Sequence, residues 1–201
     1  MNNPPGPFAR LSSLPKAGDI DVAKTYAAVG HALSSWEMHV EMQIAYLYNV
    51  VVRPDHISFA IKRSFGTLNA PTAKRPMIAA AAVVFFARFP EPEASGKGLE
   101  RDLEKVLADY ATGAARRNAF AHGIVAPHVA DHAAITGFYV GPNFVSPGKR
   151  DINLTPEYLY SSEEIAAYAG AFYVFETRIR TLCTHLLEHF QSFPEERRKR
   201  Y

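Results

Sequence analysis

Hydrophobic residues recur along most of this chain every three or four positions, which is the spacing of one face of an α-helix. This pattern predicts a helix over residues 21–52, bent near Gly30, and a shorter helix over 57–68. The segment 73–89 is apolar nearly all round, so we expect it to form a helix at the centre of a bundle. A fourth helix over 99–122 stops before Gly123. The stripes of the first and fourth helices are formed by Trp36, Val40, Ile44, Leu47 and Val51, and by Leu99, Leu103, Val106, Tyr110 and Ala114.

The helical spacing is lost after Gly123 and returns at Ser161. Within this interval residues 134–140 read as a strand, and Gly141-Pro142-Asn143 read as a turn, so we expect a small hairpin or an ordered excursion over 124–160. Ser161 and Glu164 have the spacing of a capping box and predict the start of a last long helix. We expect its stripe in the bundle core, with a dimer seam as the alternative; the stripe is formed by Ile165, Tyr168, Phe172, Phe175, Ile179, Leu182 and Leu186.

Together these elements predict an all-α fold, an up-and-down bundle of four to five helices with a small β-hairpin or loop excursion before the last helix. A length of 201 residues suits one well-buried core. We therefore expect one helical domain over 19–191, preceded by a flexible N-terminal arm over 1–18 and followed by a charged C-terminal tail over 192–201.

Composition indicates where the protein is located, but it does not indicate which activity the protein has. The net charge of +2 is too small for a general attraction to polyanions, so nucleic-acid binding would need a local basic patch. The single cysteine, Cys183, has no partner for an internal disulfide, which fits a reducing cytoplasm. The most apolar run, 78–86, is far shorter than the roughly 20 residues of a membrane span. We expect a cytoplasmic protein that does not contact a membrane.

Four polar residues gather at the end of the fourth helix, where its packing stripe stops: Arg116, Arg117, Asn118 and His122. Asn118 and His122 lie one turn apart on the same face. Arg117 lies about 140° round from His122 and continues the packing stripe, so its long side chain must converge with the imidazole.

Arg117-Asn118, three further residues and His122 resemble the RNxxxH motif of the HEPN-domain superfamily. The resemblance implies a helical bundle that forms a homodimer and brings two motifs together in one cleft. It also implies a metal-independent endoribonuclease, without metal or cofactor, in which Arg117, Asn118 and His122 are catalytic. Arg116 would then contact the RNA. Glu37 and Glu41, one turn apart on the first helix, are candidates for supporting the motif residues.

The residue types suit that chemistry. An imidazole exchanges protons near neutral pH, and the negative end of the helix dipole favours its protonated form, so His122 fits the role of general acid. A guanidinium binds phosphate through two parallel hydrogen bonds, which fits Arg117. Asn118 would orient the imidazole or the substrate. Because one chain supplies one His122, the partner base would be the His122 of a second copy.

Other readings remain open at this point. Arg117 could pair with Glu37 or Glu41 while His122 caps the helix. The chain would then be a non-catalytic HEPN module that binds nucleotide, RNA or a protein such as an antitoxin, or a structural dimerisation protein. A metal site at His31, His39 and Glu41 is disfavoured because His39 and Glu41 face different directions. His128 and His132 lack a third ligand, and Gly96-Lys97-Gly98 lacks the spacing of a phosphate-binding loop.

Overall fold

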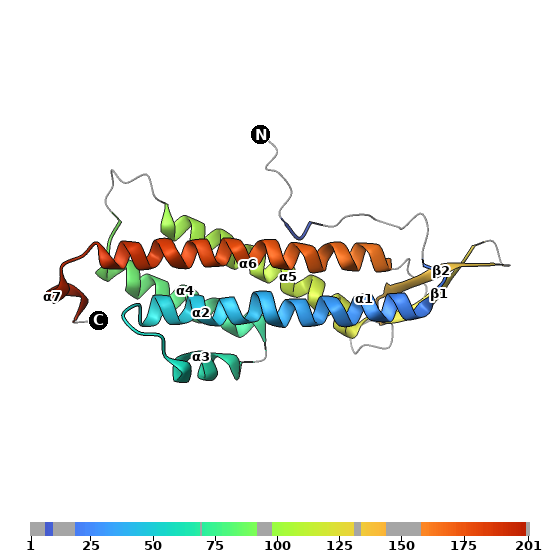
Figure 1. Cartoon of the computed structure of the whole chain (residues 1–201), viewed down its shortest axis with the longest axis horizontal. Helices are drawn as coiled ribbons and strands as arrows, with labels where there is room; N and C mark the ends of the chain where they lie inside the picture. The colour runs from blue at the N-terminus through green and yellow to red at the C-terminus, as the bar shows by residue number, and fades with distance from the viewer. Residues whose placement is uncertain are drawn as a thin grey trace. The chain divides into compact units, whose positions relative to one another are not determined.

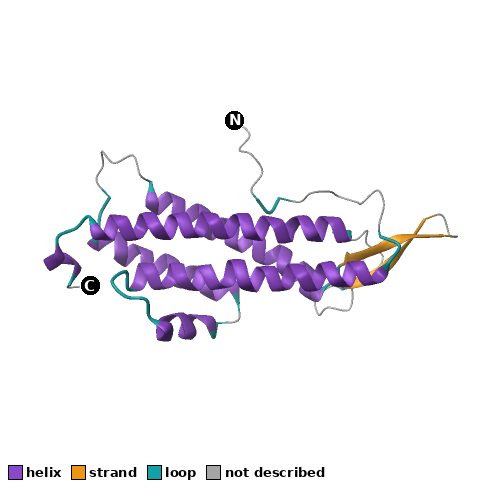
Figure 2. Cartoon of the chain, in the orientation of Figure 1, coloured by secondary structure: helices purple, strands orange, loops and turns teal. Residues whose placement is uncertain are grey.

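The computed structural model describes residues 7–9, 19–68, 70–91, 98–130, 134–143 and 158–199. These residues are mostly helical, with one two-stranded hairpin (Figures 1 and 2). The mainly helical fold with a small antiparallel hairpin is therefore confirmed. In chain order the elements are α1 (Val22–Ser35), the π-helix η1 (Trp36–Glu41), α2 (Met42–Val52), α3 (Phe59–Gly66), α4 (Pro71–Arg88), α5 (Leu99–His122), β1 (Ile124–Ala130), β2 (Ala134–Gly141), α6 (Ser162–Gln191) and α7 (Glu195–Arg198).

The chain divides into two compact units. Unit 1 comprises Met1–Glu37 and Thr112–Tyr173, and unit 2 comprises Met38–Ala111 and Val174–Tyr201. Unit 1 holds α1, the end of α5, the hairpin and the start of α6. Unit 2 holds α2, α3, α4, most of α5 and the rest of α6.

The first predicted helix is irregular at a different place from the one expected. Gly30 lies inside the regular helix α1, whereas residues 36–41 form the π-helix η1. The predicted stripe is nevertheless buried, because Trp36, Val40, Ile44, Leu47 and Val51 are each at most 1% exposed. Asn49 closes the turn after α2: its Nδ2 donates to the carbonyls of Arg53 and His56, and its Oδ1 accepts from the Ser58 amide.

The last long helix, α6, begins as predicted. The Ser161 hydroxyl accepts from the Glu164 amide at 3.2 Å, and the Glu164 carboxylate accepts from the Ser161 amide at 3.0 Å, which completes the capping box. Every residue of the predicted stripe is buried within the chain. The prediction of a core stripe is confirmed, and the alternative of a dimer seam along this stripe is wrong.

Helix α4 is buried on one face only. Ile78, Phe85 and Phe86 pack inward, while Val83 and Val84 are 63% and 58% exposed. The expectation that this helix is buried on all sides at the bundle centre does not hold for the single chain. An apolar sequence shows that a helix can be buried, but it does not show how many neighbours will cover it.

The core of unit 1 is aromatic. Phe172 lies 5.1 Å from the Trp36 ring and 5.6 Å from the Phe8 ring, measured between centroids. Gly113 allows this approach, because a Cβ there would lie 2.9 Å from Trp36 and 3.0 Å from Phe8. Phe8 falls in the segment predicted to be a flexible arm, yet it is 1% exposed. The arm prediction is wrong at residues 7–9, and the remainder of 1–18 lies outside the described residues.

The hairpin follows α5 directly. β1 and β2 pair antiparallel from Ile124 opposite Gly141 to Ala130 opposite Ala134, with an irregularity between His128 and Val129. Gly141-Pro142-Asn143, predicted as a turn, lie at the end of β2, with Gly141 as its last residue, and do not join the two strands. β2 is tied to the rest of unit 1 at two points, since Phe138 bridges to Asp19 and Val140 bridges to Tyr160.

The charged C-terminal tail is partly ordered. Residues 195–198 form the short helix α7, and the guanidinium groups of Arg197 and Arg198 lie over the rings of Phe193 and Phe190. Among the described helices, none combines the length and the apolar character that crossing a bilayer requires.

Candidate functional site

The polar cluster predicted from sequence lies on the last two turns of α5, in unit 1. Arg116 and Arg117 are adjacent but point to different partners. Arg116 Nε donates to the Phe8 carbonyl at 3.2 Å, and its NH1 donates to the Tyr160 hydroxyl at 3.4 Å. Arg116 therefore fixes the ordered N-terminal residues to α5, and this was not visible in the sequence because Phe8 is 108 positions away.

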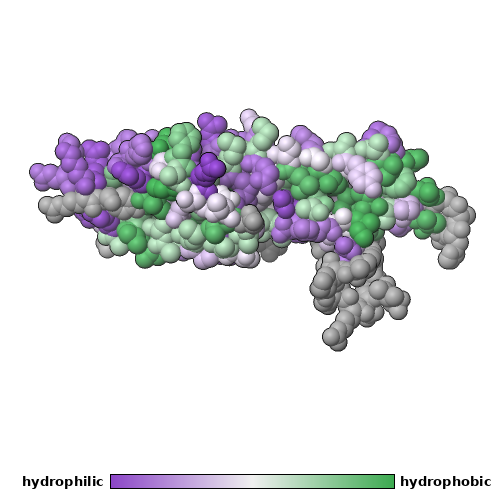
Figure 3. Space-filling view, turned by 90° about the horizontal axis from the view of Figure 1, so that it is seen from below, coloured by the Kyte–Doolittle hydropathy of each residue, from purple (hydrophilic) through white to green (hydrophobic). Residues whose placement is uncertain are grey.

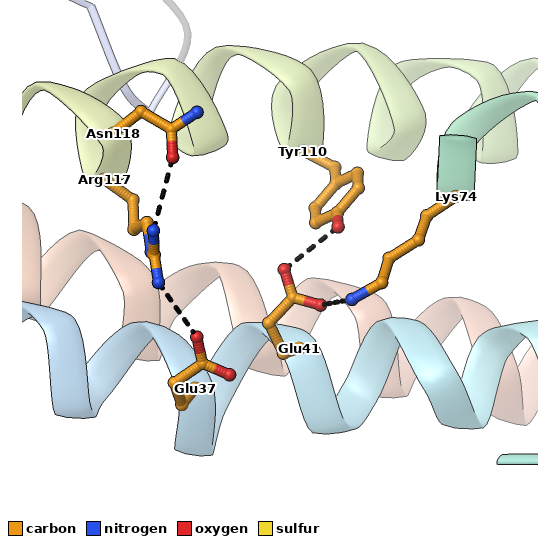
Figure 4. A network of polar contacts seen from close by, with 6 residues as sticks. All are labelled: Glu37, Glu41, Lys74, Tyr110, Arg117 and Asn118. Carbon is orange, nitrogen blue, oxygen red and sulfur yellow. Dashed lines mark hydrogen bonds and ion pairs between the residues drawn. The ribbon is translucent and has the colours of Figure 1, made fainter. Parts of the chain in front are cut away.

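Arg117 bridges α5 and the π-helix η1. Its NH2 donates to Glu37 Oε1 at 3.4 Å, and its NH1 donates to Asn118 Oδ1 at 3.4 Å (Figure 4). Of the two carboxylates that could pair with Arg117 on sequence grounds, Glu37 or Glu41, the structure shows the pairing with Glu37. The ion pair holds the guanidinium beside Asn118 at the surface of the helix pair.

This ion pair is weak. The Arg117 side chain is 31% exposed and that of Glu37 is 60% exposed. Exposed pairs contribute only about 0–1 kcal/mol, because water screens the charges and both side chains must be ordered. A phosphate that offers two oxygens to the guanidinium could therefore displace Glu37 at small cost.

His122 is the last residue of α5, and its side chain is exposed. Within the described part of the chain, its imidazole has no hydrogen-bond partner, so both ring nitrogens are accessible to a ligand. Gly123 sets the chain direction after it: a Cβ at Gly123 would collide with Val140 and with the carbonyl oxygens of Ala119 and Gly141. The residue after the histidine must be glycine for β1 to start this close to β2.

Glu41, the other predicted supporting carboxylate, has different partners in unit 2. Its Oε2 lies 2.5 Å from Lys74 Nζ, and its Oε1 accepts from the Tyr110 hydroxyl at 3.0 Å (Figure 4). Lys74 and Glu41 are only 9% and 14% exposed. The network satisfies a charge pair that would otherwise be costly to bury, which is a structural task.

A second buried carboxylate in unit 2 was missed by the sequence analysis. Glu176 Oε2 lies 2.6 Å from His39 Nδ1, and Glu176 Oε1 accepts from Gln43 Nε2 at 3.3 Å and lies 3.6 Å from Arg180. The Glu176 side chain is 12% exposed. His39 and Glu176 are 137 positions apart, and no local spacing could have connected them.

The other candidate sites from sequence are dispersed. No group of three or more His, Cys, Asp or Glu side chains is arranged to hold a metal ion in the parts of the chain that the structure describes. His128 lies on β1 with its Nδ1 2.8 Å from the Thr136 hydroxyl, whereas His132 and residues 96–97 fall outside the described residues.

Comparisons with known proteins found no significant match to this chain among family models, curated proteins or solved structures.

Proposed function

We propose that this chain is a HEPN-type endoribonuclease that acts as a homodimer through Arg117, Asn118 and His122. The observation that carries the proposal is the end of α5, where an exposed imidazole follows, by one turn, a guanidinium and an amide that contact each other. Among the described residues the guanidinium forms one ion pair, with Glu37, and that pair is exposed. A site of this kind is ready to exchange a carboxylate for a phosphate.

The reaction would be attack of a ribose 2′-hydroxyl on the adjacent phosphorus. A base removes the hydroxyl proton, the new P–O bond forms, and the bond to the 5′-oxygen of the next nucleotide breaks as an acid protonates that oxygen. The products are a 2′,3′-cyclic phosphate and a 5′-hydroxyl. Arg117 would bind the phosphate oxygens as negative charge develops, and His122 would act as the acid. The His122 of a second copy would act as the base.

The alternative is a non-catalytic module that binds nucleotide, RNA or a protein partner at the same residues. The Arg117–Glu37 ion pair favours this alternative, because the Glu37 carboxylate already occupies the position at which Arg117 would bind a substrate phosphate. The contacts of Arg116 with Phe8 and Tyr160 favour it as well, since they assign this predicted RNA-binding residue a structural task.

A cleavage assay separates the two. Purified protein is incubated with mixed RNA in EDTA, and the ends of the products are identified. We expect 2′,3′-cyclic phosphate and 5′-hydroxyl ends from the wild type, and a loss of at least about 100-fold in rate for both Arg117→Ala and His122→Ala. His31→Ala is the matched control, because His31 is also an exposed helical histidine of unit 1.

Glu37→Gln tests whether Arg117 binds a substrate phosphate or only serves as a structural partner of Glu37. Removing the carboxylate leaves Arg117 available to phosphate, so we expect cleavage at least equal to the wild type and a free energy of unfolding lower by no more than about 1 kcal/mol. Equal cleavage rates for wild type and His122→Ala would exclude His122 from the reaction, and RNA that is bound but left intact would favour the non-catalytic alternative.

A further inference from the structure

A cavity of about 270 Å³ opens on one face of the hairpin in unit 1. The face is formed by alternate residues of β1, namely Ile124, Ala126 and His128, and by Tyr139 and Gly141 of β2. Cavities that hold drug-sized ligands run from about 300 to 1,000 Å³, so this one suits a single flat ring system. Gly141 keeps it open on one side, because a Cβ there would lie 3.2 Å from Leu159, which also lines the cavity.

The lining is apolar and aromatic. No lysine, arginine, aspartate or glutamate among the described residues contributes to it, and Pro127 and Pro142 add two further flat apolar groups. The rings of His128 and Tyr139 meet edge to face, with centroids 5.4 Å apart. Hydrophobic residues also gather around the hairpin end of unit 1 in the space-filling view, where Ile124, Val129 and Ile135 are between 44% and 53% exposed (Figure 3).

His128 contributes a polar ring to the lining of this cavity. The Thr136 hydroxyl donates to the His128 carbonyl at 3.2 Å, so the 2.8 Å contact between Nδ1 and the same hydroxyl oxygen requires Nδ1 to donate. In the neutral ring Nε2 is then an acceptor, and it has no hydrogen-bond partner among the described residues. A ligand with a flat apolar face and polar atoms at its edge matches this combination.

The cavity lies next to the motif. Ile124 follows His122 by two positions, so their Cα atoms are at most about 7 Å apart. Close packing of Gly123 against Val140 and Gly141 holds the hairpin against the end of α5. The segment just before α6 contacts the same end, since the Tyr158 hydroxyl donates to the Ala119 carbonyl. The positive charges of Arg116 and Arg117 stand on that same end.

We propose that this cavity binds one nucleobase of the nucleic acid or nucleotide whose phosphate is held by Arg117. The inference rests on the proposed function for its phosphate site, and adds to it a base subsite supplied by the hairpin. Single-stranded RNA is recognised by placing unstacked bases against aromatic side chains, and such contacts tolerate many sequences because every base has a flat face. The hairpin would therefore position the strand, and Arg117 and His122 would act on the phosphate beside the bound base.

The test measures binding without cleavage. A short single-stranded RNA with 2′-O-methyl groups lacks the attacking hydroxyl, and its binding is followed by fluorescence anisotropy. Ala126→Phe fills the cavity from β1, and Ile135→Phe adds the same ring to an exposed position of β2 that does not line it. We expect about a tenfold weaker binding for Ala126→Phe and no change for Ile135→Phe.

A second measurement uses only the wild-type protein. One nucleotide of the probe is replaced by an abasic ribose at each position in turn, and we expect about a tenfold loss of affinity at one position and little change at the others. In Ala126→Phe the same replacement should have no further effect. Adenosine monophosphate and ribose 5-phosphate serve as small probes: tight binding of the first alone would identify a free nucleotide as the source of the base.

Each outcome supports or overturns the proposal. Equal binding of the intact probe by wild type and Ala126→Phe, or no sensitivity to an abasic position, would show that no base enters the cavity and that its apolar lining serves another contact. If the abasic effect is found but unmodified RNA is not cleaved, the base subsite stands and the nuclease proposal fails. If cleavage depends on Arg117 and His122 while Ala126→Phe cleaves and binds normally, the nuclease proposal stands and the base subsite fails.

Discussion

Adjacent side chains in this chain have different surroundings. Arg116 is held by the Phe8 carbonyl and the Tyr160 hydroxyl, whereas Arg117 is held by Asn118 and an exposed glutamate. The sequence located both arginines at a helix end, because helix periodicity and the position of Gly123 are local signals. It could not distinguish their tasks, because the groups that do so, Phe8 and Tyr160, lie far from them along the chain.

Cys183 shows how burial alone sets the chemistry of a residue. It is 1% exposed on α6, and burial raises the pKa of its thiol from 9.0 to about 12. At pH 8 its thiolate fraction is then about 1,000-fold below that of an exposed cysteine. We expect an aromatic disulfide reagent to leave the native protein unmodified for hours and to react rapidly in guanidinium, which absorbance measures. Rapid labelling of the native protein would contradict the buried position.

The same shift makes stability depend on pH. Between pH 9 and 12 the unfolded chain loses the thiol proton while the folded chain keeps it, so the free energy of unfolding falls as pH rises. By pH 10.5 the free energy of unfolding is lower by about 2 kcal/mol because of this thiol. Burial raises the pKa of Tyr46 as well, and the charge of Cys183 adds to that rise, so Cys183→Ala, measured by urea unfolding over the same range, removes both contributions of the cysteine.

At the scale of elements, the features that were predicted correctly depend on residues that lie close together in the sequence. The capping box and the stripe of α6 were both predicted, since each depends on residues within a few positions of one another. The π-helix was not, because hydrophobic spacing does not reveal where the hydrogen bonding widens by one residue. The exposed face of α4 was not predicted either. An apolar composition shows which faces of a helix can be buried, but it does not show which of them the neighbouring elements cover.

The ion pair between Glu41, the last residue of η1, and Lys74 of α4, both in unit 2, gives a prediction at this scale. Lys74→Met leaves the Glu41 carboxylate without its cation at a site where only 14% of the side chain is exposed (Figure 4). We expect a loss of about 3 kcal/mol or more in the free energy of unfolding, measured by urea denaturation. In the double variant Lys74→Met, Glu41→Gln the carboxylate charge is removed together with the ammonium, so a good part of that loss should be recovered. A single variant that loses less than about 1 kcal/mol would show that water reaches Glu41 freely.

At the scale of the whole molecule, the proposed chemistry needs more than one chain supplies. General acid and general base must both act on one phosphate, and the motif of each chain ends in one histidine, His122. The proposed HEPN-type function rests on this motif. The oligomeric state is therefore the property that tests the mechanism most directly.

We expect the active species to have twice the chain mass of 22.3 kDa in light scattering. Because the site would be shared, cleavage per chain should fall on dilution through the dimer dissociation constant, and adding His122→Ala chains in excess to wild type should suppress activity by forming mixed dimers. Arg63→Ala, a change at an exposed residue in the last turn of α3, is the control and should dimerise and cleave normally.

A monomer whose rate per chain is independent of concentration would exclude the shared site. In that case His128, on β1 in unit 1, becomes the candidate for the second proton carrier, and His128→Ala tests it.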